Sequence, residues 1–125
     1  MIHVKERISL REYQKECLSV LLKGEAKWNR QCAVMPTGSG KTAVMMSLAK
    51  AKLPERTLVL CHRRKLIEQA HEAAWEMIGL EAGIEMGTTR AEKDNALVIG
   101  SVQSMVNRLG EWSPDHFKTL SLIHI

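Results

Sequence analysis

The chain has 125 residues, the length of one domain. Hydrophobic residues make up 45% and charged residues 26%, a composition that argues against disorder. No apolar run approaches the roughly 18 residues of a membrane span and the N-terminus lacks a signal-peptide core, so we expect no membrane segment. Three widely spaced cysteines argue against a disulfide scaffold or a cysteine zinc site and fit reduced thiols in a cytoplasmic location.

The net charge of +4 conceals an asymmetry along the chain. Residues 1–65 contain 14 Lys and Arg against 5 Asp and Glu, which gives +9. Residues 66–125 contain 4 against 9, which gives −5. A basic first half fits a polyanionic partner such as a nucleotide or a nucleic acid, and it fits a solvated basic surface equally well.

The first predicted helix covers about residues 9–23. Ser9 and Glu12 have the spacing of a capping box, and the apolar residues that follow have helical spacing. Gly24 suits the position after the helix.

The rest of the chain alternates between short apolar strands and helices. The strands are expected at residues 31–35, 57–61, 82–86, 96–100 and 120–125. The helices are expected at residues 41–52, 65–78 and 103–109, the last two ending at Gly79 and Gly110. Strands that are apolar throughout are buried on both faces, so the pattern predicts an α/β fold with a parallel sheet and helices on both of its faces.

A glycine-rich loop between a strand and a helix, Met-Pro-Thr-Gly-Ser-Gly-Lys-Thr at residues 35–42, is the sharpest chemical signal. Gly38 and Gly40 let backbone amides converge on one point, and the helix that begins at Lys41 directs its positive end there. Lys41 can reach the β- and γ-phosphates of a nucleotide, and the Thr42 hydroxyl can ligate the Mg²⁺ that bridges them.

Met35 stands where the regular P-loop pattern, G-x-x-x-x-G-K-[ST], has its first glycine. The strand–loop–helix frame still favours a P-loop over a chance glycine-rich turn. Residues 36–42 resemble motif I of superfamily-2 helicases, the DEAD/DEAH-type and type III restriction-enzyme-like translocases. The resemblance implies a P-loop NTPase of RecA-like fold that binds ATP and Mg²⁺, with Lys41 and Thr42 in the catalytic machinery. The nucleotide-binding residues that it implies in this loop are Pro36, Thr37, Gly38, Ser39, Gly40, Lys41 and Thr42.

Arg11-Glu12-Tyr13-Gln14, on the first helix, resembles the R-x-Y-Q adenine-recognition element of the same family. The Gln14 amide presents a donor and an acceptor to an adenine edge together, and the flat guanidinium of Arg11 can stack on the base. The alternative for Gln14 is a surface polar residue. Gln14 lies on the apolar stripe of the helix, where an unpaired amide costs ~1–3 kcal/mol, and we favour adenine recognition mainly because of its position relative to motif I.

The segment His62-Arg63-Arg64-Lys65 follows the strand at residues 57–61 and is similar to motif Ia, although Lys65 replaces the family's usual Glu. In the family this segment holds a sugar-phosphate backbone, so His62, Arg63 and Arg64 are implied nucleic-acid ligands, and adjacent cations suit that role. The alternative is a basic helix N-terminus, which the helix dipole disfavours.

Two further segments are weaker candidates for contacts with nucleic acid. Ser101 and Gln103 resemble the T/S-x-Q element, motif Ic, and the alternative for Ser101 is a helix N-cap. Residues 87–90 are a candidate backbone-contact loop. The restriction-enzyme character of these motifs favours DNA over RNA as the partner.

The resemblance covers about residues 8–125, and it implies that residues 1–125 are a partial helicase ATP-binding domain. Residues 117–125 look like the strand that leads into motif II, whose Asp and Glu would position Mg²⁺ and water. We therefore expect a domain truncated before motif II, taken from an ATP-dependent helicase or translocase, that hydrolyses ATP poorly or not at all alone. The alternative is a stand-alone nucleotide-binding module or a small P-loop phosphotransferase. No oligomeric state is predicted.

Overall fold

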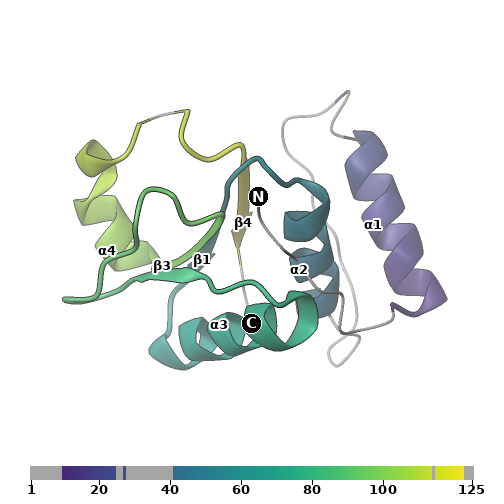
Figure 1. The fold of residues 1–125 in the computed structure, drawn as a ribbon, viewed down its shortest axis with the longest axis horizontal. Coiled ribbons are helices and arrows are strands. Elements are labelled where there is room, and N and C mark those ends of the chain that lie inside the picture. Colours follow the sequence, from purple (N-terminus) through teal and green to yellow (C-terminus); the bar gives the residue numbers. More distant parts are fainter. Residues whose placement is uncertain (1–9, 25–26, 28–40, 114, 123–125) are drawn as a thin grey trace.

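The computed structural model describes residues 10–24, 27, 41–113 and 115–122 (Figure 1). The predicted strand at residues 31–35 and the loop residues 36–40 lie outside this part. In chain order the elements are α1 (Glu12–Gly24), α2 (Lys41–Ala51), β1 (Thr57–Cys61), α3 (Arg64–Ile78), β2 (Gly83–Glu85), β3 (Leu97–Ser101), α4 (Val102–Asn107), the short 3₁₀ helix η1 (Leu109–Glu111) and β4 (Thr119–Leu122).

The four described strands form one parallel sheet in the order β2-β3-β1-β4. In this register Val59 of β1 lies opposite Ile99 of β3 and Ser121 of β4. All of these strands therefore end at the same edge of the sheet. The predicted parallel α/β architecture is confirmed.

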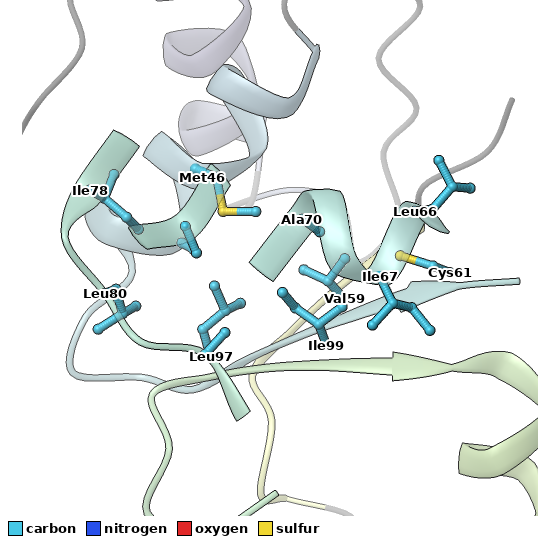
Figure 2. Packing of buried hydrophobic residues seen from close by; sticks show 13 residues of the cluster. Met46, Val59, Cys61, Leu66, Ile67, Ala70, Ile78, Leu80, Leu97 and Ile99 are labelled. Atoms are coloured by element: carbon cyan, nitrogen blue, oxygen red, sulfur yellow. The ribbon is translucent and has the colours of Figure 1, made fainter. Parts of the chain in front are cut away.

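The side chains of β1 and β3 alternate between two cores, as expected for strands covered on both faces. Val59 and Ile99 are fully buried on one face, in a core to which α2 and α3 contribute (Figure 2). Leu58 and Val98 point to the other face, where they pack with Met105 of α4. Figure 1 shows α4 and α2 on opposite sides of the strands. The sheet is thus the rigid layer that positions the loops at its carboxyl edge.

The helix after β3 differs from its predicted limits. It covers Val102–Asn107, and Gly110, the predicted stop, lies inside η1. The helix begins early because the side chain of Ser101 caps it. It ends early because the Arg108 N–H bonds the carbonyl of Met105, three residues back, which tightens the last turn.

Candidate functional site

The first half of the candidate site is built from α1 and α2, which pack against each other (Figure 1). Helix α2 begins at Lys41, as predicted, so Lys41 and Thr42 lie in its first turn. Thr42 is half-buried, and no acidic residue occupies this turn. A helix N-terminus with a lysine, a hydroxyl and no carboxylate suits a phosphate ligand. The other predicted loop residues, Pro36, Thr37, Gly38, Ser39 and Gly40, lie outside the described part of the chain.

Gln14 is the buried residue of α1, with 6% of its surface exposed. Its side-chain Oε1 accepts a hydrogen bond from the Arg11 backbone N–H at 2.8 Å. The Arg11 carbonyl accepts from the backbone N–H groups of Gln14 and Lys15, at 3.0 and 2.9 Å. Arg11 therefore occupies the N-cap position, and Gln14 is the third helical residue, which reaches back as in one half of a capping box.

The predicted position of Glu12 as the third residue of the helix is wrong, because Glu12 is the first residue of α1, and Ser9 lies outside the described residues. The reading of Gln14 as a surface residue is wrong as well, because the side chain is buried. Arg11 is exposed. The hydrogen bond from the Arg11 N–H fixes the orientation of the Gln14 amide.

The second half of the site lies at the carboxyl edge of β1 and β3. Cys61 and Ser101 are partners in the parallel register, and each is the last residue of its strand. His62, Arg63 and Arg64 leave β1 at this level and are exposed. Gln103, two residues after Ser101, is exposed as well. The structure thus brings together the two segments that resemble motif Ia and motif Ic.

The cations after β1 stand at the start of α3. Arg63 is the N-cap residue, has extended backbone and makes no side-chain cap. Within the described part of the chain, Arg63, Arg64 and Lys65 form no ion pair, and all three are exposed. Positive side chains at the positive end of a helix are unfavourable unless an anion binds there. This electrostatic arrangement favours a polyanionic partner.

Ser101 has a structural role in addition to any role in binding. Its Oγ accepts a hydrogen bond from the Ser104 backbone N–H at 3.0 Å, so Ser101 is the N-cap of α4. The alternative prediction for Ser101, that it is a helix N-cap, is therefore confirmed. A hydroxyl that accepts in a cap still has its own hydrogen to donate, so capping is compatible with a phosphate contact.

Cys61 contributes packing and no chemistry to this edge. Burial raises the pKa of its thiol to about 11, so the sulfur stays protonated at neutral pH and is a poor nucleophile. Among the described residues, no group of three His, Cys, Asp or Glu side chains could hold a metal ion. No described helix is long and apolar enough to cross a membrane.

The sequence analysis missed a buried ion pair beside this edge. Glu85, at the end of β2, and Arg108, after α4, are joined from Oε2 to Nη1 at 2.7 Å. The one available signal was a carboxylate in the apolar run at residues 82–86, because such a group is buried only with a partner. The partner is 23 residues away in sequence, so no local pattern identifies it.

Comparisons with known proteins agree with this architecture. The family model described as "Type III restriction enzyme, res subunit" (ResIII) matches residues 7–123. A protein of Schizosaccharomyces pombe (strain 972 / ATCC 24843), named "Putative mitochondrial ATP-dependent helicase irc3", is 36% identical over an alignment of 121 residues, and the match covers 90% of this chain. The chain spans 20% of the length of that relative.

Among solved structures, the fold is similar to that of a nuclease-deletion mutant of the type ISP restriction-modification enzyme LlaGI, solved in complex with a DNA substrate mimic. The TM-score is 0.53 and the identity 17%, over 92% of this chain and 12% of that one. The α/β, RecA-like fold and the resemblance to superfamily-2 helicases are confirmed. Because the family model matches nearly all of its length, the chain belongs to the type III restriction enzyme, res subunit (ResIII) family.

Proposed function

We propose that this chain is the ATP-binding part of an ATP-dependent helicase or translocase that acts on DNA. The register of Cys61 with Ser101 is the observation that carries the proposal. It sets exposed cations and the exposed amide of Gln103 at one sheet edge, the edge where open parallel sheets bind ligands. Cations contact phosphates without reading sequence, as a translocating enzyme requires.

ATP with Mg²⁺ supplies the phosphoryl group that such an enzyme transfers to water. In this proposal Lys41 holds the β- and γ-phosphates and the Thr42 hydroxyl ligates the Mg²⁺, from the first turn of α2. The loop residues Thr37, Gly38, Ser39 and Gly40 supply backbone N–H groups, and Pro36, which has no backbone N–H, opens the loop. Gln14 reads the adenine edge from α1, with its amide oriented by the bond to Arg11, and the Arg11 guanidinium stacks on the base.

The relatives support the proposal, which rests on the register of Cys61 with Ser101. The S. pombe relative is named as an ATP-dependent helicase, and the LlaGI structure contains a DNA substrate mimic. Because this chain spans a fifth of the first relative, the activity of a whole protein stays a proposal here. The expected cytoplasmic location also stays a prediction, since the name of that relative includes "mitochondrial".

Nucleotide titrations test the proposal. The chain is titrated with fluorescent ATP and GTP analogues and Mg²⁺, with and without a single-stranded DNA or RNA oligonucleotide. We expect preference for ATP, loss of binding in Lys41→Ala, and tighter ATP binding when DNA is present. ATP binding that is indifferent to both oligonucleotides would support a stand-alone nucleotide-binding module instead, and equal binding of GTP would contradict the role of Gln14.

A further inference from the structure

We propose that Arg108 and Glu85 are positioning residues for nucleic-acid binding. They hold the turn at residues 86–89, here called the β2 turn, against α4, so that the turn and the segment from Ser101 to Gln103 meet a nucleic-acid backbone as one surface. The inference rests on the proposed function, because it assigns residues that order the proposed binding edge.

The β2 turn is a tight reversal directly after β2. The backbone N–H of Met86 donates to the Thr89 carbonyl at 3.0 Å, and the Thr89 N–H donates to the Met86 carbonyl at 2.9 Å. Gly87 has φ +59°, a left-handed conformation that suits glycine. Because Glu85 lies opposite Gly100 in the parallel register, the turn emerges at the level of Ser101. Gly87, Thr88 and Thr89 are exposed there.

One guanidinium group binds this turn at several points. Nη1 of Arg108 donates to Oε2 of Glu85 at 2.7 Å and to the carbonyl of Thr89 at 3.3 Å. Nη2 donates to the carbonyl of Gly87. Only 13% of the Arg108 side chain and 3% of the Glu85 side chain are exposed. A planar guanidinium with several fixed donors can satisfy all of these acceptors at once, whereas a lysine ammonium has a single donor centre.

Helix α4 is linked to the same turn by a second route. The backbone N–H of Gly87 donates to Oγ of Ser104 at 3.2 Å. The backbone N–H of Ser104 donates to Oγ of Ser101 at 3.0 Å. The other carboxylate oxygen of Glu85 accepts from the Ala91 N–H at 3.0 Å, which fixes the far side of the loop. The position of the turn is therefore tied to that of the α4 N-cap.

This arrangement predicts that the guanidinium shape matters beyond its charge. Arg108→Lys keeps a cation beside Glu85, so no buried carboxylate is left unpaired, but it loses the fork that spans Gly87 and Thr89. The variant separates positioning of the turn from neutralisation of a buried charge. A destabilised control, Ile78→Val, trims a buried residue in the core on the other face of the sheet.

The experiment compares the wild-type chain, Arg108→Lys and Ile78→Val in three measurements. These are Tm, hydrogen exchange of the Gly87 and Thr89 amides, and anisotropy titration of a labelled single-stranded DNA. We expect Arg108→Lys to exchange faster at both amides and to bind the oligonucleotide roughly fivefold more weakly, the scale of one lost hydrogen bond. ATP-analogue affinity should not change. Ile78→Val should lower Tm without changing exchange at the turn or oligonucleotide affinity.

Unchanged hydrogen exchange of the Gly87 and Thr89 amides in Arg108→Lys would show that Arg108 does not hold the β2 turn, whatever the oligonucleotide affinity. Faster exchange with unchanged affinity would overturn its role in binding. Failure of the proposed function looks different: the wild-type chain would bind no oligonucleotide, or would bind it with an affinity insensitive to Arg63→Ala and Arg64→Ala. Absent binding would overturn both the proposed function and the positioning role.

Discussion

Cys61 and Ser101, the last residues of β1 and β3, are partners in the parallel register. Cys61 is buried, whereas the Ser101 hydroxyl caps α4 as an acceptor and keeps its own hydrogen to donate. Their role is to fix the level at which the following residues leave the sheet. His62, Arg63 and Gln103 therefore emerge together and exposed, beside Ser101.

Removing the cations after β1 should weaken DNA binding and its salt dependence together. For the double change Arg63→Ala and Arg64→Ala we expect the slope of log K against log salt to fall by about 0.7 per lost phosphate contact on single strands. Tm should change little, because both side chains are exposed and make no ion pair with the described residues. Anisotropy titrations at several salt concentrations measure the slope.

Lys118→Ala is the matched control for this change. Lys118 is exposed and directly precedes β4, so it lies at the amino edge of the sheet, opposite the proposed binding edge. Its removal takes away one positive charge without touching that edge. An equal loss of slope in Lys118→Ala would mean that overall charge, and not the cluster after β1, attracts the DNA.

Gln14 allows capping and adenine recognition to be separated. Gln14→Ala leaves the Arg11 N–H without its acceptor, so it should cost about 1 kcal/mol of stability and also weaken ATP binding. Gln14→Glu keeps an acceptor for the Arg11 N–H, and the helix N-terminus offsets part of the cost of burying a carboxylate, so Tm should fall less than in Gln14→Ala. It removes the amide donor, so ATP affinity should still fall. Thermal melts and ATP-analogue titrations of both variants check this, and normal ATP affinity in Gln14→Glu would contradict the adenine role.

The elements with strong local signals are those that the sequence predicts well. Residues 57–61 form β1 with the predicted limits, and the helix predicted at residues 65–78 is observed at Arg64–Ile78. That helix ends at Gly79, whose φ is 67°, the left-handed conformation expected of a glycine after a helix. Apolar strands and a glycine stop are read from adjacent residues, so these predictions need no tertiary information.

The sequence-based predictions fail where a contact depends on a partner far along the chain, or on a different residue from the one that the local pattern indicates. Ser9 and Glu12 form a good capping pattern in the sequence, but α1 begins at Glu12, and the third helical residue, which accepts from the Arg11 N–H, is the buried Gln14. The pair of Glu85 and Arg108 depends on how β2 and α4 meet in three dimensions. A sequence pattern of a few residues indicates which contacts are possible. The burial of side chains in the folded protein determines which of those contacts form.

Ser101 and Gln103 should differ in what they contribute. Ser101→Ala removes the cap of α4 and should lower stability by about 1 kcal/mol. Ser101→Asp keeps a capping acceptor but places a negative charge at the proposed phosphate site, so it should fold normally and bind DNA less well. Gln103→Ala changes an exposed side chain and should alter DNA affinity alone. Urea unfolding with DNA titration distinguishes the three, and full DNA affinity in Ser101→Asp and Gln103→Ala would contradict a contact at this segment.

A pH-dependent contribution to stability is expected from His116, away from the binding edge. Its ring packs against Trp112 and Phe117, with centroids 5.0 and 4.8 Å away. Burial, followed by the charges of Arg56 and Lys93, lowers the pKa of His116 below its usual 6.5, and a hydrogen bond to the backbone of Lys93 opposes this only in part. The folded protein therefore disfavours the imidazolium form.

The sign of the effect follows from proton binding. With a folded pKa below the unfolded value of 6.5, the unfolded state binds more protons as the pH falls below 6.5. The contribution of His116 to stability is complete above that pH and is lost as the pH decreases toward the folded pKa. His116→Gln removes the titrating group, so its urea midpoint should decrease less than that of the wild type between about pH 7.5 and pH 5.5. Identical pH profiles for the wild type and His116→Gln would contradict the assignment.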